Sequence, residues 1–251
     1  MSGHSKWATT KHRKAAVDAK RSKQFSKLSR IITVAARSGG DPNPDNNAPL
    51  AAAIDKARSY SLPKDKIQSA IAKAFAVGAG ANYEEVTYEG YGSGGIALLV
   101  EALTDNRNRT AADVRAAFTR AGGSLGATGS VAFQFERKGE IIIEKAKAPG
   151  EDDLLMAVME AGGEDMEDND EDFVVVTAPN EITAVRKSLE EQGIEIAGAE
   201  LVMRPLTPVA VSVETAKKVL RLVDALDESE DVQEVFHNME MTEELAAALD
   251  V

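Results

Sequence analysis

The chain contains no cysteine among its 251 residues, so disulfide bonds, thiolate chemistry and cysteine-ligated zinc are excluded. Aromatic residues make up only 5% of the sequence, and any hydrophobic core must therefore consist mainly of Ala, Val, Ile and Leu. No run of about 18 apolar residues is present, so we expect no membrane-spanning helix. The basic N-terminus is not followed by an apolar stretch, which does not fit a secretory signal and favours a cytoplasmic protein.

Charge is distributed unevenly along the chain, whose formal net charge is −12. Residues 1–38 hold ten Lys or Arg and one acidic residue, a sum of +9. Residues 39–138 sum to zero, with eleven of each sign, and residues 139–251 sum to −21, with eight basic and 29 acidic residues. A basic segment on an acidic body favours a polyanionic partner held at one end, and nucleic acid is the first candidate.

Three helices are predicted near the N-terminus, because apolar side chains recur there at three- and four-residue steps. The first two span residues 14–38 and 49–60. The third follows Pro63, and its expected buried face consists of Ile67, Ala70, Ile71, Ala74 and Phe75. Gly78 and Gly80 mark the end of this all-helical domain.

Strand-like patterns begin after residue 80. Two strands flank a glycine-rich turn, and a capping box at residues 110–113 predicts the start of a helix. Two further strands, 131–136 and 139–144, are expected to meet at a turn at Lys138-Gly139. From residue 139 to 204 the predicted order is β-α-β-β-α-β, which is the ferredoxin-like order.

These patterns predict an α+β multidomain protein with a helical N-terminal domain and two α/β domains, one inserted in the other. The segment after residue 206 supplies a helix and a strand without a core of its own, so we expect it to complete the earlier sheet. The predicted domains are residues 1–79, residues 80–135 joined with 206–251, and an inserted ferredoxin-like domain at 136–205.

Two motifs have both a functional and a structural interpretation. Gly90, Gly92 and Gly95 match G-x-G-x-x-G, but a strand is predicted after them, so a tight hairpin is favoured over a nucleotide-binding loop. Arg107 and Arg109 lie in a corner, Thr104–Thr110, between a predicted strand and helix. They are candidate phosphate ligands, or solvated side chains beside a turn that Asp and Asn residues shape.

No motif predicts a metal site or catalysis. Residues 165–172 include six acids among eight, but they lack the glycine and glutamate positions of a calcium loop, so a solvated turn is expected. The histidines His4, His12 and His237 show no metal-ligand spacing. Neither a P-loop nor a set of catalytic side chains is recognisable. We therefore expect no metal, no cofactor, no small-molecule substrate and no enzymatic activity.

The basic N-terminal segment supplies the main candidate site. Its cations would neutralise phosphates, while its aromatic rings would stack on a base or donate to phosphate. Trp7 has an alternative role as an apolar staple on the helical domain. The candidate nucleic-acid contacts are Lys6, Trp7, Lys11, His12, Arg13, Lys14, Lys20, Arg21 and Lys23, with Arg107 and Arg109 as secondary contacts.

Motifs along essentially the whole chain resemble YebC-type proteins, which include probable transcriptional regulatory proteins and relatives of mitochondrial translational activators. The matching segments are GHSKWA (3–8), KHRKAA (11–16), DAKR (18–21), LPKD (62–65), YEGYG (88–92), TDNRNRT (104–110), GSVAF (129–133) and DVQEV (231–235). The resemblance implies a helical N-terminal domain, two α/β domains with the third inserted in the second, and a cytoplasmic regulator.

The resemblance also implies a partner. Bacterial relatives are described as promoter-binding transcriptional regulators, whereas others act on the ribosome, including relief of stalling at proline-rich stretches. We expect a non-enzymatic, DNA-binding transcriptional regulator. Two alternatives remain open: a translation factor that binds ribosomal RNA and a ribosome with its nascent chain, and a scaffold whose acidic domains bind a basic partner.

Overall fold

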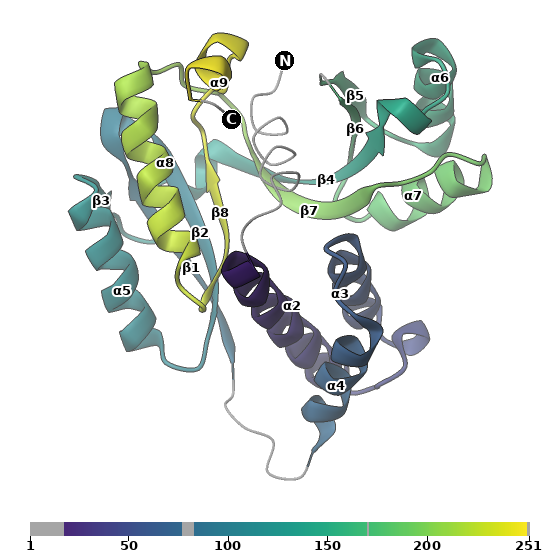
Figure 1. The fold of residues 1–251 in the computed structure, drawn as a ribbon, viewed down its shortest axis with the longest axis horizontal. Helices are drawn as coiled ribbons and strands as arrows, with labels where there is room; N and C mark the ends of the chain where they lie inside the picture. The colour runs from purple at the N-terminus through teal and green to yellow at the C-terminus, as the bar shows by residue number, and fades with distance from the viewer. Residues whose placement is uncertain (1–17, 77–82, 170, 250–251) are drawn as a thin grey trace.

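The computed structural model describes residues 18–76, 83–169 and 171–249. Three groups of elements are visible in Figure 1. A helical unit lies at the bottom, and two sheets, each with its own helices, lie above it at the left and at the right. This α+β multidomain layout confirms the predicted fold class. Within the described residues, no helix is long and apolar enough to cross a membrane.

The helical unit consists of α2 (Asp18–Gly39), α3 (Ala48–Ser59) and α4 (Lys64–Phe75). Asn47 caps α3 by accepting a hydrogen bond from the Leu50 N–H, and its amide donates to the Ala35 carbonyl of α2. Pro49 lies in the first turn of α3, where its missing N–H costs no hydrogen bond. The three predicted helices are therefore confirmed, apart from residues 14–17, which lie outside the described part of the chain.

One predicted core residue of this unit is exposed. The buried stripe of α4 is Ile67, Ala70 and Ala74, whereas Phe75 is 45% exposed. Phe75 follows Ala74 by one residue, which turns it about 100° around the helix axis and out of the buried stripe.

Sheet A is antiparallel, with strand order β3-β1-β2-β8. Its helices α5 and α8 cover one face, and α9 packs on α8. The last strand comes from residues far along the chain, so the C-terminal segment completes this sheet. The elements are β1 (Glu84–Tyr91), β2 (Ala97–Thr104), α5 (Arg107–Arg120), β3 (Ser124–Leu125), α8 (Val213–Asp227), β8 (Val232–His237) and α9 (Glu243–Leu249).

Sheet B has strand order β5-β6-β4-β7, and its elements follow in the order β-α-β-β-α-β. Helices α6 and α7 bury their apolar stripes against it. The domain boundaries at residues 79, 135 and 205 stay a prediction. The elements are β4 (Phe135–Glu144), α6 (Glu151–Ala161), β5 (Asp165–Asp168), β6 (Asp172–Thr177), α7 (Ile182–Glu191) and β7 (Gly198–Pro205).

Three local predictions were wrong. The two strands expected to meet at Lys138-Gly139 are one strand, β4, in which Gly139 pairs with both β6 and β7. A side chain at Gly139 would collide with Thr177 at 2.3 Å, so glycine permits close packing there and does not form a turn. Helix α5 begins at Arg107 instead of Thr110, because Asn106 caps it by accepting a hydrogen bond from the Arg109 N–H.

The third wrong prediction is the solvated acidic turn at residues 165–172. Its first four residues form β5, and Asp172 at the start of β6 is only 1% exposed. Glu167 forms an ion pair with Arg204 of β7, and both side chains are largely buried. Glu167 therefore helps to hold β5 and β7 together in sheet B. Within the described residues, no group of His, Cys, Asp and Glu is arranged to hold a metal ion.

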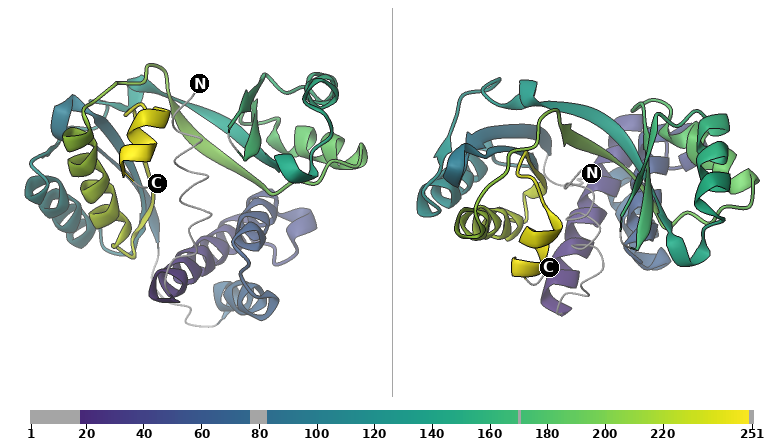
Figure 2. Two further views of the ribbon diagram at one scale, coloured as in Figure 1. Left: turned by 45° about the horizontal axis from the view of Figure 1, so that its top comes forward. Right: turned by 90° about the horizontal axis from the view of Figure 1, so that it is seen from above.

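The two sheets contact each other through a shared cluster of buried apolar side chains. Phe135 of β4 and Leu99 of β2 belong to one buried cluster, against which Met203 and Phe236 pack. Among the described residues, the apolar cluster of the helical unit is formed by residues from 25 to 74. In the left view of Figure 2 the helical unit lies below the long strands β4 and β7, and its helix α3 contacts β7.

Candidate nucleic-acid interface

The predicted basic site is only partly within the described chain. Lys6, Trp7, Lys11, His12, Arg13 and Lys14 all lie outside the described residues. Lys20 and Arg21 lie in the first turn of α2. Lys23 is also in α2, and its side chain is 42% exposed.

Three basic residues of α2 face an acidic segment after α8. Lys23, Lys27 and Arg30 recur at steps of four and three residues, so they form one stripe, which we call the α2 stripe. The segment 227–231 begins at the last residue of α8 and has the sequence Asp-Glu-Ser-Glu-Asp, and we call it the acidic segment. Each member of the stripe donates to a carbonyl or carboxylate of this segment.

The contacts of the α2 stripe become shorter from Lys23 to Arg30, and Arg30 is more buried than Lys23. Lys23 Nζ lies 3.2 Å from Glu228 Oε2, and both side chains are exposed. Lys27 Nζ donates to the Asp227 carbonyl at 3.0 Å. Arg30 donates to Asp231 Oδ1 at 2.9 Å, and its guanidinium lies over the Tyr83 ring, 4.9 Å from the centroid.

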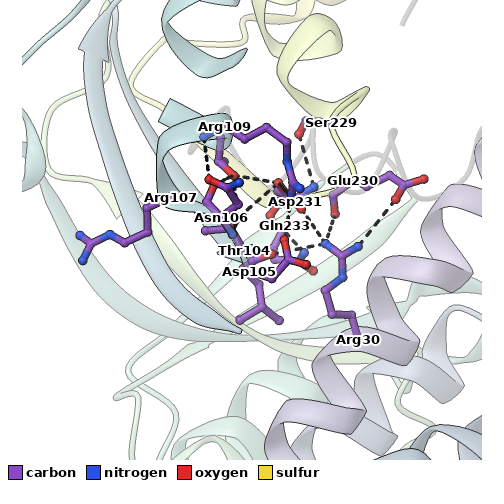
Figure 3. Close-up of polar contacts among 12 residues, drawn as sticks. Arg30, Thr104, Asp105, Asn106, Arg107, Arg109, Ser229, Glu230, Asp231 and Gln233 are labelled. Atoms are coloured by element: carbon purple, nitrogen blue, oxygen red, sulfur yellow. Dashed lines mark hydrogen bonds and ion pairs between the residues drawn. The ribbon is translucent and has the colours of Figure 1, made fainter. Parts of the chain in front are cut away.

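Asp231 is the centre of a polar cluster between α2, α5 and β8 (Figure 3). One carboxylate oxygen accepts from Arg30, and the other accepts from Arg109 at 2.8 Å and Thr110 at 2.7 Å. Burial alone would raise the pKa of Asp231. The hydrogen bonds from Arg109 and Thr110, together with the two guanidinium charges, outweigh burial and lower that pKa below its ordinary value.

The two arginines of the predicted corner have different environments. Arg109 is held by Asp105 and Asp231, and these hydrogen bonds raise the pKa of its guanidinium. Arg107 is 64% exposed, and it forms an ion pair with Glu84 at an N–O distance of 3.5 Å. The structure therefore shows Arg109 in an intramolecular cluster, whereas Arg107 points away from that cluster (Figure 3).

A cleft of about 510 Å³ opens beside this cluster, between α5 and the end of α8. Its lining includes three arginines and five carboxylates, so its formal charge is negative. Such a balance disfavours an anionic ligand in the free protein. The charged lining residues are Arg30, Arg109, Arg120, Asp105, Asp113, Glu228, Glu230 and Asp231.

A second basic surface, on α4, was missed by the sequence analysis. Lys64, Lys66 and Lys73 are exposed, and none forms an ion pair with another described residue. Lys66 and Lys73 are seven residues apart, so they share one face of the helix. Asp65 is the only acidic residue of α4, and this local excess of positive charge was the sequence signal that would have identified the surface.

The glycine-rich loop is a hairpin, as predicted. A single turn, Ser93–Gly95, leads directly into β2, and the Gly92 N–H donates to the Ile96 carbonyl. Gly94 and Gly95 have φ values of 73° and 74°, which glycine adopts without strain. The loop leads into strand β2 and does not open a helix, so it lacks the strand-loop-helix order of the nucleotide-binding fingerprint.

Glu89 is a buried carboxylate that the sequence analysis did not single out. It accepts hydrogen bonds from the N–H groups of Gly129, Val131 and Ala132. Burial alone would raise the pKa of Glu89, but these three donors outweigh burial and lower it. The carboxylate therefore fixes the loop that leads from sheet A into β4.

Comparison with known proteins covers the whole chain. Residues 5–76 match the family described as TACO1/YebC protein N-terminal domain, and residues 83–239 match TACO1/YebC second and third domain. A Rubrobacter xylanophilus protein is 51% identical, with 98% of each chain covered. An Enterococcus faecalis protein is 54% identical, with 96% of this chain and 99% of the relative covered. Both carry the name probable transcriptional regulatory protein.

The fold also has a close structural neighbour. The crystal structure of a conserved hypothetical protein from Aquifex aeolicus superimposes with a TM-score of 0.83 at 45% sequence identity. The alignment covers 93% of this chain and 96% of that one. The arrangement of a helical unit and two sheets is therefore shared with a solved structure.

Proposed function

Because the chain belongs to the TACO1/YebC family, as its motifs predicted, we propose that it is a non-enzymatic regulator of gene expression that binds nucleic acid. The names of its relatives favour transcription, and promoter DNA is therefore the first target to consider. The observation that carries the proposal is the separation of charge: +9 in residues 1–38 against −21 in residues 139–251. We place the protein in the cytoplasm.

Binding is proposed to occur on the helical unit. The N-terminal cations Lys6, Lys11, Arg13 and Lys14 neutralise phosphates, and the exposed lysines of α4 provide further phosphate contacts. Residues 135–205, which form sheet B and its helices, hold 19 acidic and seven basic residues and are repelled by the phosphates, which orients the protein on its target. Lysine contacts to phosphate carry no base information, so sequence specificity is weak.

The salt dependence of binding tests this function. The variant Lys11→Ala/Arg13→Ala/Lys14→Ala removes three cations, and the slope of log K against log salt should fall by about 0.9 for each lost phosphate contact. The control, Lys187→Ala/Lys217→Ala/Lys218→Ala, removes three exposed cations from α7 and α8 and should leave the slope unchanged. Equal slopes for the first variant and the wild type would rule out the proposed contact.

Two binding assays on the same protein distinguish DNA from the ribosome as the target. Gel shift on duplex DNA and co-sedimentation with ribosomes are compared at about 150 mM salt, where weak non-specific binding fades. Transcriptional regulation requires the DNA complex to persist. Retention on ribosomes with loss of the DNA complex would instead establish the translation factor.

A further inference from the structure

The helical unit is attached to both sheets by charged side chains. Lys56 of α3 lies between Glu200 of β7, at 3.4 Å, and Glu234 of β8, at 2.7 Å. Asp55, its neighbour in sequence, pairs with Arg186 of α7 at 2.7 Å. Together with the α2 stripe, these pairs connect the helical unit to sheet A, sheet B and α7.

The acidic segment presents oxygen acceptors to the α2 stripe, as a phosphodiester chain would. It places four carboxylates and several carbonyl oxygens within five residues. Its oxygens meet three cations that recur along one side of α2. Lysine and arginine bind phosphate oxygens through the same donors that here bind carboxylates. The acidic segment and a nucleic acid strand therefore require the same face of α2.

We propose that the acidic segment is a built-in competitor for nucleic acid: it covers the α2 stripe in the free protein, and a phosphodiester chain displaces it. Displacement removes the contact between α2 and the acidic segment, so the α2 stripe and the lysines of α4 are both available to phosphates, while the Lys56–Glu234 pair still joins α3 to β8. This inference rests on the proposed function, and it adds that the affinity of the free protein is held below its full value.

The individual contacts are weak enough for a nucleic acid strand to replace the acidic segment on the α2 stripe. Glu228 and Glu230 are exposed, with side-chain accessibilities of 67% and 69%, and exposed ion pairs are weak and screened by salt. Asp231 is also fixed by Arg109 and Thr110, so it stays with sheet A when α2 leaves. The weak part of the contact is at Lys23, the first residue of the stripe, where a nucleic acid chain would first compete.

Neutralising the exposed acids tests the competition. The variant Glu228→Gln/Glu230→Gln should bind a random-sequence DNA duplex and a random-sequence RNA about three- to tenfold more tightly than the wild type, since two weak competing pairs are lost. The matched control is Glu151→Gln/Glu160→Gln, which removes two exposed acids from α6, where neither forms an ion pair with another described residue. This control should bind as the wild type does.

The outcomes separate the inference from the proposed function. An equal gain in both variants would mean that only net charge matters, and it would overturn the inference while leaving nucleic-acid binding intact. No gain in either variant, with a binding wild type, would overturn it in the same way. Absence of binding by every variant would overturn the proposed function, and the competition with it.

A distance measurement provides a second readout that does not depend on affinity. The chain has no cysteine, so Ser38→Cys on α2 and Thr119→Cys on α5 place two spin labels specifically, both at exposed positions. The label distance should broaden and lengthen when the DNA duplex is added, and also in free Glu228→Gln/Glu230→Gln. A distance that is unchanged by a saturating duplex would overturn the inference.

Discussion

The two interfaces of this molecule differ in their chemistry. The sheets meet through Phe135, Leu99, Met203 and Phe236, an apolar contact whose stability depends little on salt. The helical unit meets both sheets through lysine, arginine and carboxylate side chains, which salt screens. The first contact joins the two sheets into one frame, and the second is the contact that a charged partner is proposed to weaken.

The largest effect is expected from breaking the apolar interface. Phe135→Ala removes a ring that is 6% exposed from the cluster between the sheets. The cost should be about 3–5 kcal/mol of unfolding free energy, because a cavity replaces the ring. Urea unfolding followed by circular dichroism measures it, and a loss below about 1 kcal/mol would contradict the assigned packing.

Breaking the centre of the ionic interface should have a smaller effect. Lys56→Met leaves Glu200 and Glu234 without their shared cation. Burial alone would lower the pKa of Lys56, but the two carboxylates outweigh burial and raise that pKa, so the lysine is charged in the folded protein. Because its side chain is 19% exposed, the loss should be about 2–3 kcal/mol, below that of a fully buried pair.

The same urea titration provides the control for Lys56. Lys187→Met breaks an ion pair in which both partners are about 70% exposed, and it should cost less than about 0.5 kcal/mol. If the two methionine variants lost equal stability, the Lys56 contact would be no stronger than an ordinary surface pair.

Lowering the pH should reduce the free energy of unfolding through two carboxylates. The pKa values of Asp231 and Glu89 are lowered in the folded protein, so their stabilisation is present above the unfolded pKa of about 4 and is lost as pH falls through the lower folded values. Each group contributes at most about 1.4 kcal/mol per pH unit. Glu89→Gln should reduce this slope below pH 4, and an unchanged slope would contradict the three backbone hydrogen bonds.

The smallest effect on stability is expected at the exposed end of the α2 stripe. Lys23→Gln removes a pair in which the lysine is 42% exposed and Glu228 is 67% exposed. The unfolding free energy should change by less than about 0.5 kcal/mol. Nucleic-acid affinity should change more clearly, because the same cation is a proposed phosphate contact. A loss of stability without any change in affinity would make Lys23 a purely structural residue.

Regular elements were predictable where one periodic signal dominates. The helices around Leu28 and Leu222 each show one apolar stripe, and the structure buries those stripes as expected. The glycine-rich hairpin was predictable because a strand pattern follows Gly95. The family was also predictable, since its motifs extend from one end of the chain to the other.

The sequence-based predictions that were wrong concern contacts between residues far apart in the chain. Nothing near Gly139 shows that Thr177 and Ile182 pack against it, so the glycine suggested a turn. Thr110 has the sequence context of a helix cap, but its hydroxyl donates to Asp231, a residue 121 positions away. The pairing of the α2 stripe with the acidic segment is equally distant, and charge counts along the sequence do not show which opposite charges meet.

Lysine reactivity tests the central claim most directly. Covalent labelling of lysines, read by mass spectrometry, is compared in the free protein and with a saturating DNA duplex or RNA. The account predicts protection of Lys6, Lys11, Lys14, Lys64, Lys66 and Lys73 by nucleic acid, with Lys187 and Lys217 unchanged. Protection confined to the lysines of α7 and α8, or no protection at all, would contradict binding through the helical unit.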